Sequence, residues 1–263
     1  MKPASVWDRR IARAGELVEK QPAAAQLLRF YQGIARFQKS VYEKLARAEG
    51  HEPAVLLAFF PELISLVRDT GSTALQQTAE ALSRSLQEFP DESKNELLQM
   101  LIAVWQHQQE TETTSAEILF FLNTLLQPWA EYLAQQTGPQ PESAQSLCPF
   151  CGSRPQLAVL KPEGDGGKRF LVCSLCSTEW TFRRVLCPGC GEEQKDRLPI
   201  FVAKEFEHVR IDACDTCHTY IKSIDLTKDG LAVPVVDELA TVSLNLWAEE
   251  NKYRKLSPNL FGV

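Results

Sequence analysis

All eight cysteines of this 263-residue chain lie in four Cys-x-x-Cys pairs, and none precedes residue 148. The pairs are Cys148-Pro-Phe-Cys151, Cys173-Ser-Leu-Cys176, Cys187-Pro-Gly-Cys190 and Cys214-Asp-Thr-Cys217. One such turn holds two sulfurs near a metal ion, and two turns complete a tetrahedral four-thiolate site. The four pairs therefore predict two metal sites.

The cysteine region repeats itself. The Cys-Pro-x-Cys-Gly string at Cys148 returns at Cys187, 39 residues later, and Cys176 corresponds to Cys217 at an offset of 41. The spacers within the two units are 21 and 23 residues, whereas 10 residues separate the units. This spacing is typical of rubredoxin-like and zinc-ribbon-like modules, in which a hairpin joins two metal-binding knuckles. Gly152 and Gly191, which follow the first knuckles, fit the positive φ that such turns require.

The repeat favours a sequential assignment of ligands, with a crossed pairing as the alternative. Site 1 is expected to comprise Cys148, Cys151, Cys173 and Cys176, and site 2 to comprise Cys187, Cys190, Cys214 and Cys217. Disulfides are disfavoured for paired cysteines in a reducing cytosol. Four-thiolate sites suit zinc, which is the commoner metal there, and also mononuclear iron. His218 directly follows Cys217 and is expected to be a neighbour of site 2 rather than a ligand.

The first part of the chain is predicted to be helical. Apolar residues recur at helical spacing through residues 1–140, and the simplest interpretation is that these apolar faces pack in a core. Ser5 and Asp8 predict a capping box, and Pro128 predicts a kink in a helix over residues 115–136. His51 and His107 are expected to be surface or cap residues. Residues 137–144, which contain two prolines and a glycine, are expected to be a linker.

The part of the chain after the expected linker is predicted to form short strands and one final helix. Strand-like runs lie at residues 156–160, 169–172, 179–186, 199–203, 208–213 and 219–225. A helix over residues 237–251 and a polar tail are expected to follow. The fold class is therefore α+β and multi-domain: an all-α domain, two small four-cysteine modules and a C-terminal helix. The expected boundaries are 1–140, 146–184, 185–234 and 235–263.

Charge and hydropathy argue against several classes of protein. The net charge is −6, and neither part of the chain is basic, which argues against nucleic-acid binding. No apolar run is long enough to predict a membrane span, and the first residues do not resemble a secretory signal, so we expect a cytoplasmic protein. Closed four-thiolate sites leave no position for a substrate, which disfavours metal-centred hydrolysis. The sequence does not indicate an oligomeric state.

The cysteine region resembles the formate dehydrogenase accessory protein family, FdhE. The resemblance is carried by Cys148-Pro-Phe-Cys-Gly-Ser-Arg-Pro155, by Arg169-Phe-Leu-Val-Cys-Ser-Leu-Cys-Ser-Thr-Glu-Trp180, by Cys214-Asp-Thr-Cys-His-Thr-Tyr-Ile-Lys222 and by Val236-Asp-Glu-Leu-Ala-Thr241. It is strong over residues 146–263 and diffuse over the helical part. It implies a helical domain followed by two rubredoxin-like modules, with the eight cysteines on the family's metal positions and iron as the associated metal.

The resemblance also implies a role. Family members are non-enzymatic assembly factors that bind the catalytic subunit of respiratory formate dehydrogenase in the cytoplasm, before its export. Candidate partner-binding residues are Glu179, Trp180, Tyr220 and Lys222, with packing of Trp180 and Tyr220 against the knuckles as the equal alternative. Two other functions stay open: a zinc-ribbon nucleic-acid module, and a thiol- or metal-based redox or sulfur-handling factor.

Overall fold

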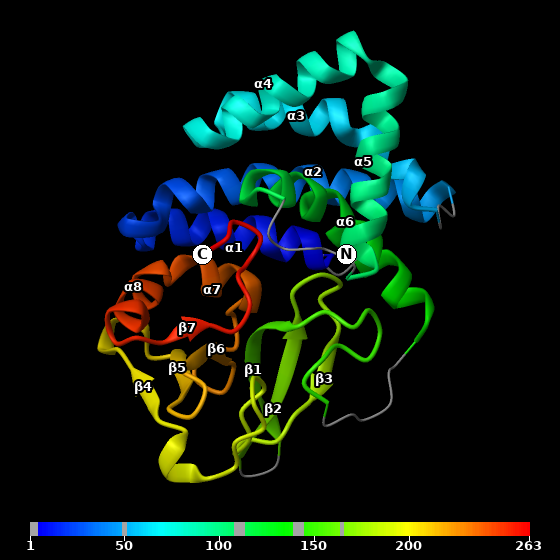
Figure 1. The fold of residues 1–263 in the computed structure, drawn as a ribbon. Coiled ribbons are helices and arrows are strands. Elements are labelled where there is room, and N and C mark those ends of the chain that lie inside the picture. Colours follow the sequence, from blue (N-terminus) through cyan, green and yellow to red (C-terminus); the bar gives the residue numbers. More distant parts are fainter. Residues whose placement is uncertain (1–4, 49–51, 108–113, 139–144, 164–165) are drawn as a thin grey trace.

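The computed structural model describes residues 5–48, 52–107, 114–138, 145–163 and 166–263. Its elements in chain order are α1 (Val6–Lys20), η1 (Pro22–Ala24), α2 (Ala25–Ala48), η2 (Pro53–Phe59), α3 (Phe60–Thr70), α4 (Thr73–Glu88), α5 (Pro90–Trp105), α6 (Ala116–Gln136), β1 (Pro155–Glu163), β2 (Gly166–Cys173), β3 (Glu179–Thr181), η3 (Lys195–Arg197), β4 (Ile200–Val202), η4 (Lys204–Phe206), β5 (Val209–Cys214), β6 (Thr219–Asp225), α7 (Pro234–Ala240), α8 (Val242–Glu250) and β7 (Arg254–Lys255). The predicted fold class is confirmed. Figure 1 shows the helices α1–α6 stacked over one end of a sheet region, with α7 and α8 beside the sheet.

The helices begin where the sequence places their caps. The Ser5 side chain accepts a hydrogen bond from the Asp8 amide, and the Asp8 carboxylate accepts one from the Ser5 amide, which confirms the capping box. The Ser72 and Ser115 side chains cap α4 and α6 by accepting hydrogen bonds from the amides of Leu75 and Ile118. Within the described residues, no helix combines the length and apolar character needed to cross a bilayer.

Pro128 lies inside α6 and removes one backbone donor from that helix. The carbonyl of Thr124, four residues earlier, instead accepts a hydrogen bond of 3.1 Å from the Gln38 side chain of α2. Gln38 is buried, so a polar side chain of α2 satisfies a backbone carbonyl of α6 that Pro128 leaves without a donor. This contact positions α6 against α2.

The two cysteine units form one sheet. Its strand order is β3-β2-β1-β6-β5-β4, with β7 beside β6. Each unit is a three-stranded antiparallel meander, and the units join where β1 pairs in parallel with β6. The repeat extends to the register: Val172 faces Glu179 in the first unit, and Ala213 faces Tyr220, each 41 positions later, in the second.

The two faces of the sheet pack against different partners. Ala158, Leu171, Trp180 and Ile221 share the main core with helices α2–α6. The other face, which includes Tyr220, packs mainly against α8. The first unit is therefore continuous with the helical core.

Two expectations for the second half need correction. The run 179–186 is a strand only at Glu179–Thr181, and the last hydrogen bond to β2 runs from the Phe182 amide to the Arg169 carbonyl. The expected helix 237–251 is two helices, α7 and α8, that break at Thr241. The tail that follows packs on the helices, where the Phe261 ring lies 5.5 Å from that of Phe30 and 5.8 Å from that of Phe120. Residues 139–144 of the expected linker lie outside the described residues.

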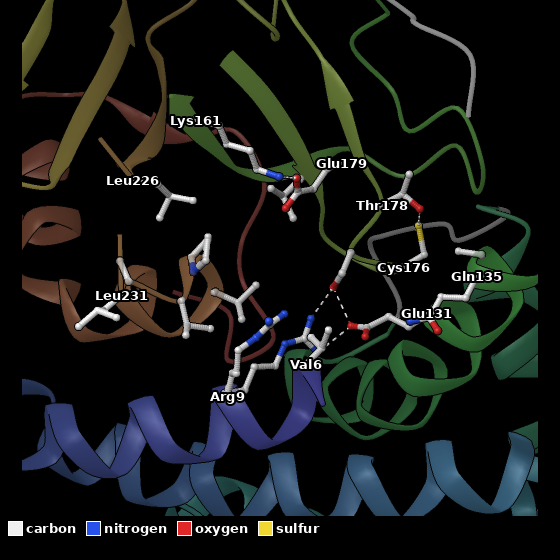
Figure 2. Close-up of a pocket in the computed structure, with 18 of the residues that line it drawn as sticks. Val6, Arg9, Glu131, Gln135, Lys161, Cys176, Thr178, Glu179, Leu226 and Leu231 are labelled. Atoms are coloured by element: carbon white, nitrogen blue, oxygen red, sulfur yellow. Dashed lines mark hydrogen bonds and ion pairs between the residues drawn. The ribbon is translucent and has the colours of Figure 1, made fainter. Parts of the chain in front are cut away.

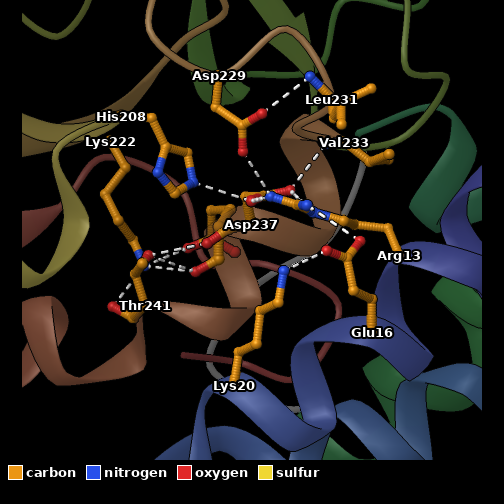
Figure 3. Close-up of polar contacts among 11 residues, drawn as sticks. Arg13, Glu16, Lys20, His208, Lys222, Asp229, Leu231, Val233, Asp237 and Thr241 are labelled. Atoms are coloured by element: carbon orange, nitrogen blue, oxygen red, sulfur yellow. Dashed lines mark hydrogen bonds and ion pairs between the residues drawn. The ribbon is translucent and has the colours of Figure 1, made fainter.

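A buried ammonium group explains the break at Thr241. Lys222 of β6 is fully buried, and its Nζ donates to the carbonyls of Glu238 and Thr241, at 2.7 and 3.2 Å. It also lies 2.9 Å from Oε1 of Glu238, an oxygen that the Lys255 ammonium group contacts as well. Burial alone would raise the pKa of Glu238, but the two ammonium groups lower it to about 2, and burial lowers the pKa of Lys222 to about 8. Figure 3 shows Lys222 meeting the end of α7.

We expect Glu238→Gln to lower the free energy of unfolding by about 3 kcal/mol at neutral pH, because it leaves a buried lysine without its carboxylate. Urea denaturation measures this. Because the pKa of Glu238 is depressed when folded, the wild type loses this contribution as pH falls from about 4.5 towards about 2, and the variant lacks that loss. Glu249→Gln, on the exposed face of α8, is the control and should change stability by less than about 0.5 kcal/mol. Equal effects of the two substitutions would contradict the assignment.

Candidate metal centres and the cleft beside them

The eight cysteines gather into two groups. One contains Cys148, Cys151, Cys173 and Cys176, and the other contains Cys187, Cys190, Cys214 and Cys217, with the sulfurs of each group within 4.8 Å of one another. This is the sequential grouping that the repeat favours. His218 belongs to neither group; its ring lies against Tyr253 instead.

Four equivalent turns shape the two clusters. The residue after the second cysteine of each pair has a positive φ: Gly152 (75°), Ser177 (53°), Gly191 (79°) and His218 (54°). The predicted use of Gly152 and Gly191 is thus confirmed. Such a turn directs amides at sulfur; the amides of Leu175 and Cys176 lie 3.3 and 3.4 Å from the Cys173 sulfur. The strained φ of Ser177 and His218 is held by the knuckle rather than favoured by the residue type.

The spacing of the sulfurs fits one tetrahedral ion per cluster. Bonds of about 2.3 Å to a tetrahedral metal place sulfurs about 3.8 Å apart. In the second cluster, Cys187–Cys217 and Cys190–Cys214 are each 3.7 Å apart. The first cluster is slightly tighter, with separations of 3.3–3.5 Å. A disulfide needs about 2.05 Å. Both clusters are therefore able to bind a metal ion, and the donor set suits zinc and iron alike.

The protons of the thiols compete with a metal. Burial raises the pKa of the Cys173 thiol. Hydrogen bonds from the surrounding thiols lower the pKa of Cys148. Metal binding at either cluster therefore displaces protons and strengthens as pH rises.

The clusters differ in their surroundings. Three ligands of the first are buried and Cys151 is partly exposed, whereas Cys190 of the second is exposed and Cys217 partly so. The difference begins inside the knuckle: Phe150 occupies the position that Gly189 holds in the second unit. Phe150 packs against Trp105 at the end of α5, with ring centroids 6.3 Å apart. The first knuckle is thereby fixed to the helices.

Polar contacts complete this junction. His107 lies 2.6 Å from the Cys151 carbonyl through its Nε2, and Gln127 of α6 donates to the Ser174 carbonyl. The buried Arg10 of α1 pairs with Glu131 of α6 at 2.8 Å and donates to the Ser177 hydroxyl at 3.1 Å. Burial opposes the charge of Arg10, but the Glu131 carboxylate outweighs it and raises the pKa of Arg10.

Sequence reasoning missed these junction residues. His107 was expected at the surface, and it is exposed, yet it touches the first knuckle. Glu131 interrupts the apolar face of α6, and an acidic residue there is a usable signal of a buried partner. Phe150, an aromatic side chain within a metal knuckle, is a second such signal.

The predicted partner-binding residues lie mostly inside. Trp180 is 3% exposed, Tyr220 is 2% and Lys222 is 0%, which supports the packing interpretation for the two aromatic side chains. Trp180 donates a hydrogen bond to the Gln145 carbonyl. Glu179 is exposed and forms an ion pair with Lys161. A role of these residues in partner binding stays a prediction.

A cleft opens beside the first cluster. Its volume is about 710 Å³, and its walls come from the start of α1, the end of α6, the knuckle at Cys176 and the segment 226–235. Figure 2 shows Val6 and Arg9 of α1 on one side and Lys161 and Glu179 on the other. Leu231 on the rim is 82% exposed. Charged groups and exposed apolar side chains thus line a surface between the helices and the first unit.

A third group of possible ligands, His208, Asp229 and Asp237, already has a cation. The Arg13 guanidinium of α1 lies 2.8 Å from Asp229 and 2.6 Å from Asp237, and His208 lies 2.9 Å from Asp237 (Figure 3). Burial raises the pKa of Asp237, but hydrogen bonds from His208 and Arg13 outweigh this and hold it below the ordinary value. The group is an ion-pair network that joins α1 to α7.

Comparisons with known proteins agree with this architecture. The family model "FdhE, central domain" matches residues 147–184, and "FdhE, C-terminal domain" matches residues 185–261. An FdhE homolog from Aquifex aeolicus is 31% identical over 94% of this chain and 92% of its own length. One from Haemophilus influenzae is 27% identical over 98% of this chain and 89% of its own length. The crystal structure of the FdhE protein from Pseudomonas aeruginosa covers 100% of this chain and 98% of its own, with a TM-score of 0.72 at 23% identity, and so shares the fold.

We expect a chelator to remove metal in two phases, first from the exposed second cluster and then from the buried first one. Release is followed with a chromogenic chelator, and total metal by elemental analysis. Cys173→Ser should keep one ion and only the fast phase, while Cys214→Ser should keep one ion and only the slow phase. The reverse assignment, or loss of both ions from either variant, would show that the difference in burial does not govern metal retention.

Proposed function

The chain belongs to the FdhE family of formate dehydrogenase accessory proteins, and from this premise we propose that it binds the catalytic subunit of a respiratory formate dehydrogenase in the cytoplasm and supports its maturation before export. Family membership is the observation that carries the proposal. The site chemistry is consistent with it, because four cysteines in each cluster would supply all the ligands of a tetrahedral ion and leave no position for a substrate. We propose that the protein acts by binding rather than by catalysing a reaction.

We propose the cleft beside the first cluster as the surface that meets the catalytic subunit. It carries the features of a protein-binding surface: an exposed apolar rim at Leu231 and Val6, and charged groups at Arg9 and Glu179 that provide specificity. Three of its walls, α1, α6 and the knuckle at Cys176, are held together by the contact among Arg10, Glu131 and Ser177. Of the four predicted partner-binding residues, only Glu179 lines this cleft.

We expect Leu231→Asp to reduce recovery of the catalytic subunit at least tenfold when the tagged protein is purified from cells that make the enzyme, because it places a charge on the apolar rim. Formate dehydrogenase activity in the same cells should fall in parallel. Leu246→Asp is the control: Leu246 is 61% exposed on α8, and it does not line the cleft.

Two outcomes would contradict this proposal at different levels. Equal recovery of the catalytic subunit by the Leu231→Asp and Leu246→Asp variants would show that the cleft is not the contact surface. Failure of the wild-type protein to recover any formate dehydrogenase subunit, with its metal content intact, would overturn the proposed partner.

A further inference from the structure

A second cavity lies against the second cysteine cluster. Its volume is about 270 Å³, and Cys187 and Cys214 form part of its wall. Most of the lining is apolar and comes from Val185, Leu186, Pro188, Leu198, Ile200 and Leu256. Val185 and Ile200 are 42% and 54% exposed, so the apolar lining reaches the surface at the mouth.

Arg169 of β2 lines this cavity and is only 2% exposed. Its Nη1 donates to the carbonyls of Arg183 and Leu186, and its Nη2 lies 3.3 Å from an Asp212 carboxylate oxygen. Neither Nε nor Nη2 has a well-aligned hydrogen-bond acceptor among the described residues. A buried donor without an acceptor is costly, so such a group points to a ligand that is missing from the chain itself.

The local charge favours an anion. Asp212 is shared: Arg210 lies 2.8 Å from one of its oxygens, and the Ser223 hydroxyl donates to the other. Two arginines therefore face one carboxylate. Arg184 and Lys195 add positive charge at the cavity lining. Among the lining residues, three cationic side chains thus stand against the single carboxylate of Asp212.

We propose that this cavity binds a carboxylate that carries a short apolar group, with Arg169 as the residue that receives the carboxylate. A guanidinium prefers the planar, two-oxygen geometry of a carboxylate, and the apolar walls favour an aliphatic chain beside it. Two sources supply this chemistry: a free short-chain acid, or a glutamate side chain between apolar residues of a docked polypeptide. The inference concerns the cavity beside the second cluster, to which Arg169 of the first unit contributes, and it stands independently of the proposed partner at the cleft.

The test uses the full metal-loaded chain and follows the Nε–H signal of Arg169 by NMR. Probes are sodium acetate and sodium butyrate, with sodium chloride at equal ionic strength, and the peptide acetyl-Leu-Glu-Leu-amide with its Gln counterpart. We expect a saturable shift with butyrate, weaker binding of acetate by about fourfold per methylene removed, and no saturable shift with chloride. Tighter binding of the Glu peptide than of butyrate, and none of the Gln peptide, would identify the polypeptide source.

Variants separate binding from folding. Arg169→Lys should abolish the response; because Arg169 is buried and this change is liable to disturb folding, Ile200→Glu provides a second test at the exposed mouth. It should weaken butyrate binding at least tenfold while both metal ions stay bound. Val202→Glu is its matched control, since Val202 is 67% exposed on the same strand and does not line the cavity. Identical responses to butyrate and chloride, or equal binding by the two glutamate variants, would overturn the proposal.

Discussion

Closure of the first cysteine cluster is the constraint on which the rest of the structure depends. One of its knuckles precedes β1 and the other follows β2, so both lie at the open end of the β1–β2 hairpin, and bringing Cys148 and Cys173 together fixes that hairpin. The same knuckles carry Phe150 and Ser177, which contact α5, α1 and α6. The first strand then pairs with β6 and so positions the second unit. One cluster thus links the helices, the sheet and the cleft.

The repeat has two copies with different roles. Both copies keep the positive φ after each knuckle and the same register between their second and third strands. They differ where a side chain meets a neighbour: Phe150 docks on helices, whereas Gly189 has no side chain to dock. The first copy is consequently buried at a junction, and the second presents Cys190 and a cavity at the surface. One copy of the duplicated module thus connects the helices to the sheet, and the other is an exposed unit.

Much of this could be predicted from the sequence, because cysteine spacing and caps are local signals. The eight clustered cysteines, the capping box at Ser5 and the change from helices to strands all follow from short-range patterns. The joining of the units into one sheet could not be predicted, since the β1–β6 pair brings together residues about 65 positions apart without a connecting turn. The helix break at Thr241 was missed for the same reason: its cause is Lys222, a side chain from another element. Burial of Trp180 and Tyr220 likewise depends on long-range packing.

The central claim is that the first cluster, and not the second, holds the helices in place. Hydrogen exchange of the α6 amides, measured by mass spectrometry, tests it most directly. The account predicts that Cys148→Ser with Cys173→Ser accelerates exchange in α6 near Gln127 and Glu131, because the knuckle contacts there are lost. Cys187→Ser with Cys214→Ser should leave α6 unchanged and accelerate exchange only in β4–β6. Unchanged α6 exchange after loss of the first cluster would contradict the account.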